Sequence, residues 1–194
     1  TTAWGMTIGV ILANKGTKVD LLARTQKEAV DLHNTGLKSE GFVLNDMPAN
    51  FRVIEDPREA LADSKAVILA VPSQTMRANV KSISKFLSKS ILIASAAKGL
   101  EIGSKKRMTQ VIAEEIDSKL KHNICVLSGP NLAREIVLGL PAATVVAAED
   151  DSVSLAMQKL LPTPTLCVFT HHDVIGVELG GTLKNIIALW AGMA

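Results

Sequence analysis

Short apolar runs alternate with segments of helical periodicity along the whole of this 194-residue chain. Each run is as long as a strand, and several lack polar residues at alternate positions, which is typical of strands covered on both faces. Strands and helices that alternate at this spacing predict βαβ units. We therefore expect an α/β fold with a doubly wound, Rossmann-like and mainly parallel sheet. The expected strands lie at 19–23, 51–54, 66–71, 91–94, 124–127, 143–147 and 166–169, and the expected helices at 5–15, 26–33, 58–63, 74–87, 105–120, 132–138 and 152–161.

Glycine and aspartate mark several ends of the expected helices. Gly16 and Gly139 each follow a helical segment, where glycine readily adopts the left-handed backbone that ends a helix. Asp56, followed by Pro57, and Asp151 provide the side-chain chemistry of a helix start. These residues predict where four of the helix ends fall.

Composition excludes two classes of partner. Lys and Arg number 21 against 19 for Asp and Glu, and aromatic residues make up 3% of the chain. The chain therefore has neither the basic stripe nor the stacking platforms of a nucleic-acid-binding protein. No apolar run approaches the roughly 18–20 residues that span a bilayer, so we expect no membrane partner.

Cys125 and Cys167 lie inside apolar runs, and two buried thiols indicate the reducing cytoplasm.

The first helical segment carries a weak signal for a dinucleotide. Gly5 lies where the last glycine of a dinucleotide-binding loop lets helix and strand pack closely, with the helix N-terminus at the pyrophosphate. Arg24 ends the following strand, where an acidic residue usually binds the ribose of NAD and an arginine can pair with the 2′-phosphate of NADP. An ordinary helix start and a solvated arginine explain both residues equally well.

Three further turns follow buried strands. They contain Pro72, Lys98 and the Gly-Pro-Asn sequence at 129–131. Doubly wound sheets bind ligands at the carboxyl ends of their strands, where such turns gather. A surface lysine on a loop is the alternative interpretation of Lys98, but three polar or glycine-bearing turns in succession favour a ligand crevice.

Four motifs occur in order along the chain: Val71-Pro-Ser73, Lys98-Gly-Leu-Glu101, Ser128-Gly-Pro-Asn-Leu-Ala133 and Gly176-Val-Glu-Leu-Gly-Gly-Thr-Leu-Lys-Asn185. Together they resemble the NAD(P)-dependent glycerol-3-phosphate dehydrogenases, the bacterial type in particular. The resemblance implies an oxidoreductase that interconverts sn-glycerol 3-phosphate and dihydroxyacetone phosphate by hydride transfer, for glycerophospholipid synthesis. NADP or NAD is then the cofactor, and a small-molecule phosphate is the substrate.

The resemblance also implies roles for individual residues. Lys184 matches the family's catalytic lysine, and a second cation nearby, Lys98, would lower its pKa and stabilise the developing oxyanion. The implied cofactor contacts are Ala3, Trp4, Gly5, Arg24, Pro72, Lys98 and Ala133. The implied substrate contacts are Lys98, Gly129, Asn131, Lys184 and Asn185.

Two features depart from the family pattern. Thr2 stands where the second glycine of the phosphate loop is common. The residues that grip the substrate phosphate belong to a domain that this chain lacks, so we expect a truncated chain. Residues 1–172 are then the dinucleotide-binding domain, without its first strand and first glycines, and residues 173–194 the first helix of the substrate domain. The alternatives are a non-catalytic dinucleotide-binding fragment and another dehydrogenase that shares the fold.

The last segment, 173–194, is apolar and rich in small residues. A helix that is apolar all round should be buried. The surface that covers it is either missing from this chain or belongs to another copy, and we expect the chain to form a homo-oligomer. His171, His172 and Asp173 are adjacent in the chain. Since adjacent side chains of a strand point to opposite faces and no further ligand is suitably spaced, we expect no metal site.

Overall fold

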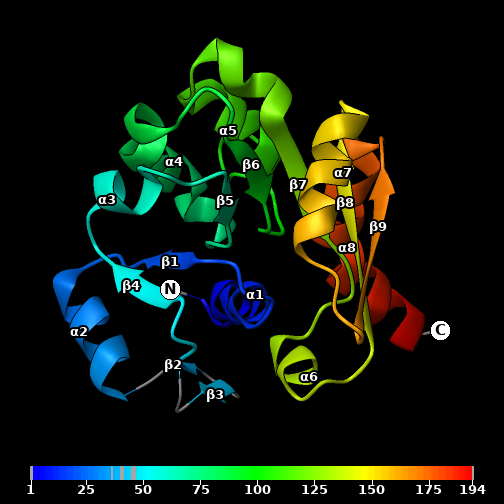
Figure 1. The fold of residues 1–194 in the computed structure, drawn as a ribbon. Coiled ribbons are helices and arrows are strands. Elements are labelled where there is room, and N and C mark those ends of the chain that lie inside the picture. The colour runs from blue at the N-terminus through cyan, green and yellow to red at the C-terminus, as the bar shows by residue number, and fades with distance from the viewer. Residues whose placement is uncertain (1, 36, 40–41, 45–46, 194) are drawn as a thin grey trace.

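A computed structural model of the chain describes residues 2–35, 37–39, 42–44 and 47–193. Thr1 and Ala194, the outermost residues of the two expected domains, lie outside the described residues. The main sheet has five strands in chain order (Figure 1). Its pairs are parallel except for one antiparallel pair, in which Cys125 lies opposite Ala148. The five strands are β5 (Ala66–Leu69), β6 (Leu92–Ser95), β7 (Ile124–Ser128), β8 (Ala142–Ala148) and β9 (Leu166–His171).

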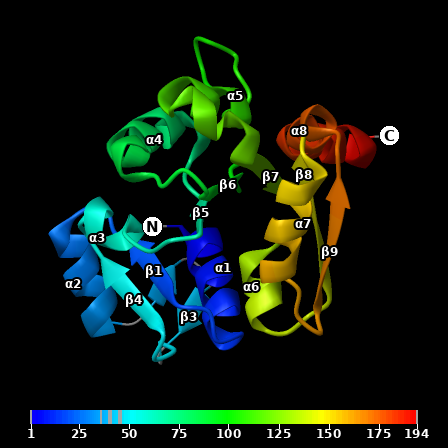
Figure 2. The same ribbon diagram turned by 45° about the horizontal axis from the view of Figure 1, so that its top comes forward.

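Two smaller sheets accompany the main one. β1 (Val19–Leu22) pairs in parallel with β4 (Phe51–Ile54), and β2 (Leu37–Ser39) forms an antiparallel pair with β3 (Phe42–Leu44). Figure 2 shows the β1–β4 pair beside α1 (Ala3–Asn14), separate from the five-stranded sheet. The expectation of an α/β fold with a mainly parallel sheet is therefore confirmed.

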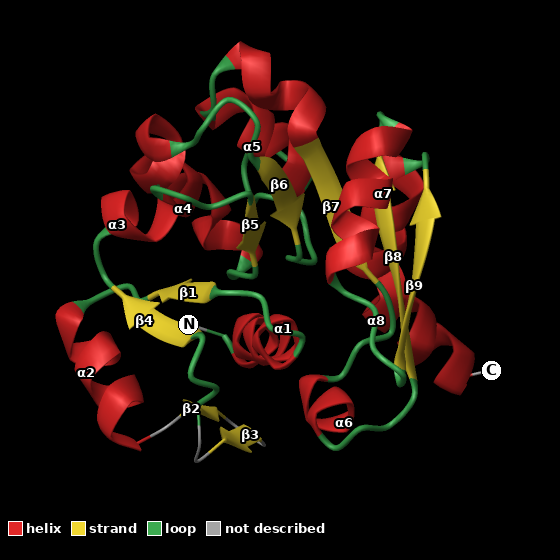
Figure 3. Cartoon of the chain, viewed as in Figure 1, coloured by secondary structure: helices red, strands yellow, loops and turns green. Residues whose placement is uncertain are grey.

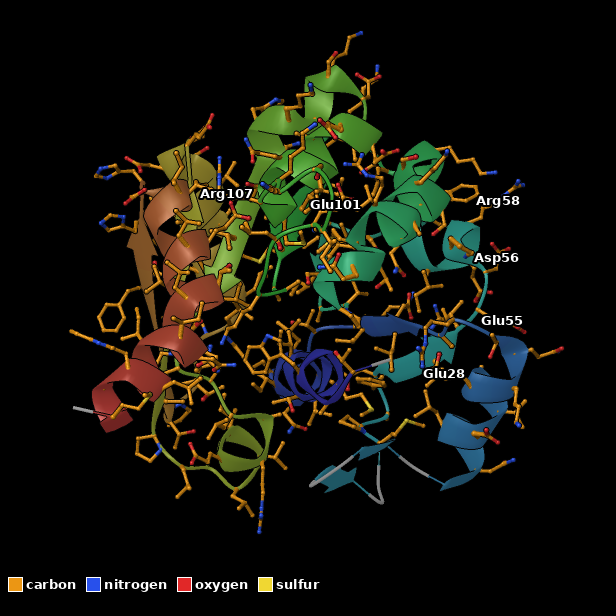
Figure 4. All side chains as sticks on the ribbon, turned by 180° about the vertical axis from the view of Figure 1, so that it is seen from behind. Glu28, Glu55, Asp56, Arg58, Glu101 and Arg107 are labelled. Atoms are coloured by element: carbon orange, nitrogen blue, oxygen red, sulfur yellow. The ribbon has the colours of Figure 1, made fainter. Side chains whose placement is uncertain are left out.

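Helices cover both faces of the five-stranded sheet. α7 lies in front of the sheet in Figure 1, and α8 lies in front in the opposite view of Figure 4. Figure 3 separates helices, strands and loops by colour. Besides α1, the helices are α2 (Gln26–Thr35), α3 (Pro57–Leu61), α4 (Met76–Ile83), α5 (Met108–Glu115), α6 (Ala133–Val137), α7 (Asp151–Leu160) and α8 (Val174–Met193), with 3-10 turns η1 (Ser73–Thr75), η2 (Ser84–Phe86) and η3 (Ser118–Asn123).

Local chemistry sets most helix ends as predicted. Gly16 and Gly139 have φ of +84° and +75° and follow α1 and α6. The Asp56 carboxylate caps α3 by accepting from the Arg58 amide at 2.8 Å. For α7 the cap is Asp150, one residue before the predicted Asp151, because Asp150 accepts from the Ser152 amide.

The helix predicted over 105–120 is wrong in length. Gly103 and Lys105 have φ of +93° and +57°, so the backbone turns before α5 and brings Leu100 into a bridge with Arg107. α5 is 8 residues long, and its chain continues through Asp117, which starts η3 by accepting from the Lys119 amide.

Three apolar clusters form the core and position the strands. The first lies between the five-stranded sheet, α1 and α7, the second between β5, β6, α4 and α5, and the third beneath the β1–β4 pair. At the third, a Cβ on Gly9 would lie 2.6 Å from Cε2 of Phe51, so α1 packs closely on β4. Representative buried residues are Leu127, Val146 and Met157 in the first cluster, Met76 and Ile93 in the second, and Met6 and Phe51 in the third.

The prediction of two buried thiols holds for one cysteine only. Cys125 lies in central strand β7, and burial raises its pKa to about 12. Cys167 is exposed, because β9 is an edge strand whose residues alternate between buried and exposed. The rings of His171 and His172 stack with centroids 4.8 Å apart rather than pointing to opposite faces, because the strand ends at His171.

α8 differs from the other helices. It is 20 residues long, and most of its apolar side chains are exposed. Among the described residues it is the one helix long and apolar enough to cross a membrane by length and composition. The expectation of no span rested on continuous apolar runs, whereas this helix has a high apolar average despite containing Glu178 and Lys184.

Candidate functional site

The start of α1 is fastened to the end of β5. The Thr2 hydroxyl accepts from the Gly5 amide at 3.1 Å and donates to the Ala70 carbonyl at 2.5 Å. A Cβ on Gly5 would lie 3.3 Å from both Thr2 Oγ1 and Ala70 Cβ. This is the close helix–strand packing expected of the last glycine in a phosphate loop. Thr2 therefore acts as the helix cap in the place where the family commonly has glycine.

The neighbouring residues of α1 are only partly open to a ligand. Ala3 is the first residue of the helix and is half-buried. Trp4 is half-buried as well, and its side chain packs against the first core cluster. The helix N-terminus, rather than the indole ring, is the feature that faces the carboxyl end of β5.

Arg24 follows β1 and lies at the surface. Glu28 accepts from its backbone amide at 2.7 Å and from Nη2 at 2.9 Å, and the Arg24 side chain is 69% exposed. The carboxylate thus orients the guanidinium while leaving most of it in solvent. In this position an incoming anion can meet the free edge of the guanidinium.

Pro72 and Lys98 lie on adjacent turns. Pro72 precedes η1, and Gln74 of that turn donates to the Leu100 carbonyl at 2.7 Å. A Cβ on Gly99 would lie 2.8 Å from Ser73 Oγ, and Gly99 has φ of +134°. The turns after β5 and β6 therefore lie directly against each other.

Lys98 joins its turn to the next one. Its Nζ donates to the Gly129 carbonyl at 2.7 Å, and the side chain is half-buried. Burial lowers the pKa of Lys98 from its ordinary value, and the positive charge of Lys184 lowers it further. The two lysines that the sequence places in one site are therefore close enough to interact electrostatically.

The turn after β7 presents Gly129 and Asn131. A Cβ on Gly129 would lie 2.7 Å from the Ala143 carbonyl oxygen, so only glycine fits there without displacement. Asn131 Nδ2 donates to Thr144 Oγ1 at 3.0 Å, and Thr144 in turn donates to the Ser128 carbonyl. Asn131 Oδ1 is buried with no hydrogen-bond partner among the described residues. This fixed, unsatisfied acceptor is suited to a ligand hydroxyl or amide.

α8 crosses the same edge of the sheet. Thr182 Oγ1 accepts from the Gly99 amide at 3.2 Å and donates to the Glu178 carbonyl at 2.8 Å. A Cβ on Gly181 would overlap Ser128 Oγ and would lie 3.5 Å from Lys98 Cγ. Lys184 and Asn185 follow on the next turn and are exposed.

The structure thus brings most of the predicted residues into one row at the carboxyl ends of β5, β6 and β7. Ala3, Trp4 and Gly5 lie at one end, then the turns of Pro72, Lys98 and Gly129, with Lys184 on α8. Ala133 begins α6 and is half-buried, whereas Arg24 lies apart at the end of β1 in a separate sheet. Sequence reasoning missed Thr144, Thr182 and Glu178, of which the last two lie inside the motif that ends at Asn185.

This row fits a dinucleotide. The N-terminus of α1 lies at the end of β5, where Gly5 lets helix and strand pack closely, and an unsatisfied acceptor and two cations lie on the neighbouring turns and on α8. Together with the parallel strand order, these turns define the ligand-binding edge of a Rossmann-type dinucleotide-binding domain.

Comparisons with known proteins identify the family. Residues 1–154 match the model of the NAD-dependent glycerol-3-phosphate dehydrogenase N-terminus. The chain is 51% identical to a glycerol-3-phosphate dehydrogenase [NAD(P)+] of Dehalococcoides mccartyi, over 100% of this chain and 54% of that protein. It is 38% identical to the enzyme of that name from Streptomyces avermitilis, over 100% of this chain and 57% of that protein. The chain belongs to the NAD-dependent glycerol-3-phosphate dehydrogenase family and spans about half the length of these relatives.

Solved structures agree with this assignment. The crystal structure of glycerol-3-phosphate dehydrogenase from Coxiella burnetii matches with a TM-score of 0.85 and 27% identity, over 99% of this chain and 58% of that one. A ketopantoate reductase from Ralstonia eutropha reaches a TM-score of 0.64 at 17% identity, which shows a shared fold alone. The alternative of another dehydrogenase with the same fold is therefore not supported.

Proposed function

We propose that this chain provides the dinucleotide-binding half of an enzyme that interconverts sn-glycerol 3-phosphate and dihydroxyacetone phosphate. Residues 1–172 form the dinucleotide-binding domain, and residues 173–194 are the first helix of a substrate domain. The substrate is a small-molecule phosphate, and the product serves glycerophospholipid synthesis in the cytoplasm. The observation that carries the proposal is the pair of lysines, Lys98 and Lys184, at the carboxyl edge of the sheet.

Individual residues of the chain then have separate roles in binding the cofactor and in transferring the proton. Gly5 and the N-terminus of α1 hold the pyrophosphate, Arg24 pairs with the 2′-phosphate of NADP, and Ala3, Trp4, Pro72 and Ala133 border the cofactor. The bound nicotinamide supplies the hydride. Lys184, starting as the ammonium, donates a proton to the developing alkoxide and is left neutral by that step, and it accepts the proton in the reverse direction.

Lys98 acts beside Lys184. Because its ammonium is fixed by the Gly129 carbonyl, it offers a positioned positive charge to the substrate oxygen. Gly129, Asn131 and Asn185 border the substrate, and the unsatisfied Oδ1 of Asn131 accepts from a substrate hydroxyl. We further propose that neither nucleic acid nor membrane is a partner, that the rest of the substrate domain or a second copy covers the exposed face of α8, and that the protein is a homo-oligomer. The polar Glu178 and Lys184 within α8 support a protein environment for this helix.

Calorimetric titration with NADPH and NADH tests the cofactor assignment. We expect tighter binding of NADPH, and we expect Arg24→Ala to remove most of that preference while leaving NADH binding similar. Arg58→Ala is the matched control, because Arg58 is also an exposed arginine but lies over the Phe86 ring, away from the row of turns. Absence of binding by either nucleotide would refute the proposed site.

Addition of dihydroxyacetone phosphate to the NADPH complex tests the reaction. Loss of the reduced nicotinamide absorbance, abolished by Lys184→Met, supports turnover by this chain. Binding without turnover instead supports the alternative of a dinucleotide-binding fragment that needs the remaining half of the family's length for catalysis.

A further inference from the structure

α8 buries a charge rather than its apolar face. Its leucines, isoleucines and Trp190 are mostly exposed, and the one buried residue in the helix, Val174–Met193, is Glu178. The Glu178 side chain is only 5% exposed. Removing a carboxylate from water costs several kcal/mol by general estimates unless its oxygens are satisfied, so this burial requires strong partners.

Those partners come from the start of α5. Glu178 Oε1 accepts from the Thr109 amide at 2.9 Å, and Oε2 accepts from Thr109 Oγ1 at 2.7 Å and from Arg107 Nη1 at 2.5 Å. Thr109 is the second residue of α5, so the carboxylate occupies the positive end of that helix. Figure 4 shows Arg107 beside α8, between this helix and the region of Glu101. Two oxygens therefore receive three donors, one of them charged.

The next turn of α8 continues the same contact surface. Thr182 lies four residues after Glu178, on the same face of the helix, and accepts from the Gly99 amide next to Lys98. Gly181 lies close to Lys98 Cγ. Because an α-helix rises about 1.5 Å per residue, Lys184 lies about 9 Å along the axis from Glu178. Fixing Glu178 and Thr182 therefore fixes both the height and the rotation of Lys184.

We propose that Glu178 is a positioning residue of the two-lysine site. Its carboxylate, bound by the α5 N-terminus and Arg107, sets the register of α8 on the sheet and so holds Lys184 beside Lys98. This inference rests on the proposed function, in which these two lysines act on one substrate. Glu178 touches neither lysine in the contacts described and acts only through the placement of the helix.

The electrostatic effect of Lys184 on Lys98 can be measured as the pKa of Lys98, a quantity that a change in overall stability alone does not alter. With lysine side chains labelled for NMR, the pKa of Lys98 is measured in the full chain without nucleotide. We expect Lys184→Met to raise the pKa of Lys98, because a nearby positive charge is removed. Glu178→Ala should raise it by at least half as much, because α8 then no longer holds Lys184 in place or buries the Lys98 stem.

A double-mutant cycle separates positioning from other causes. In the Glu178→Ala background, Lys184→Met should change the pKa of Lys98 much less than in the native chain. Glu149→Ala is the matched control, since Glu149 is an exposed glutamate between β8 and α7 and should leave Lys98 unchanged. Amide exchange in β7 and β8 reports whether the sheet remains folded. If Glu178→Ala unfolds the chain, Glu178→Met gives the same readout, since it fills a similar volume but offers no acceptor to the Thr109 amide, the Thr109 hydroxyl or Arg107.

Two results would overturn the inference: an unchanged Lys98 pKa in the folded Glu178 variant, or an undiminished effect of Lys184→Met within it. Neither measurement uses a nucleotide. Failure to bind NADPH would therefore refute the proposed function while leaving the positioning result intact, and an unmoved Lys98 would refute positioning whatever the nucleotide does.

Discussion

Adjacent glycines in α8 allow the docking of this helix to be measured against an internal control. Gly180 and Gly181 lie in the interior of the same helix, so replacing either by alanine should favour helix formation by about 1 kcal/mol. A Cβ on Gly180 meets nothing within 4 Å, whereas a Cβ on Gly181 overlaps Ser128 Oγ and lies 3.5 Å from Lys98 Cγ. Overpacking of this kind costs about 1–3 kcal/mol.

Gly180→Ala should therefore stabilise the chain, and Gly181→Ala should be less stable than Gly180→Ala by about 1–3 kcal/mol. Urea unfolding followed by far-UV circular dichroism measures the difference, and unchanged m-values would show that both variants unfold from similarly compact states. Hydrogen exchange of the α8 amides shows whether Gly181→Ala loosens the helix locally. Equal stability of the two variants, within about 0.5 kcal/mol, would refute the expected cost of overpacking Gly181 against Ser128.

Two further predictions concern ionisable groups. Arg77 donates twice to Glu101 at 2.8 Å and holds the pKa of Glu101 at about 2, below its ordinary 4.5. Because the pKa is lowered in the folded chain, the ionised carboxylate stabilises the fold above about pH 4.5, and this contribution is lost as the pH falls towards 2. Arg77→Met should therefore flatten the decline of the unfolding free energy between these two pH values. An unchanged slope would contradict the ion pair. The native chain should also expose one thiol to a disulfide reagent, and Cys167→Ser should remove it, because Cys125 is buried with a pKa near 12. Rapid labelling of Cys125 in the folded chain would show that β7 is less protected than the structure requires.

Much of the fold follows from local sequence patterns. The apolar runs gave the positions of β1 and β4 to β9 to within a few residues, because strands packed between helices carry mostly apolar residues. Gly16 and Asp56 marked helix ends because their conformations and side chains act within one turn. The hairpin β2–β3 was not predicted, since its three-residue strands are too short for a periodic pattern.

Other features depend on contacts that sequence patterns do not encode. Lys105 adopts a left-handed backbone that lysine rarely favours, so nothing signalled the turn that shortens α5. The exposure of Cys167 follows from the edge position of β9, which is a property of strand order rather than of the apolar run. In both cases the deciding neighbours come from the tertiary structure.

Glu178 shows the same limit within the candidate site. Acidic residues are almost never buried unless paired, so a glutamate in an apolar helix is ordinarily taken for a surface residue. Its partners, Arg107 and Thr109, lie 71 and 69 residues away in the chain, at the start of a helix whose predicted beginning was wrong. The motif around Lys184 therefore predicts which lysine reacts, whereas the position of that lysine depends on how the preceding turn of α8 binds α5. A variant that keeps both lysines but shifts this helix should lose their mutual effect, and for this reason the residues that position the site must be sought on α5 and α8 together.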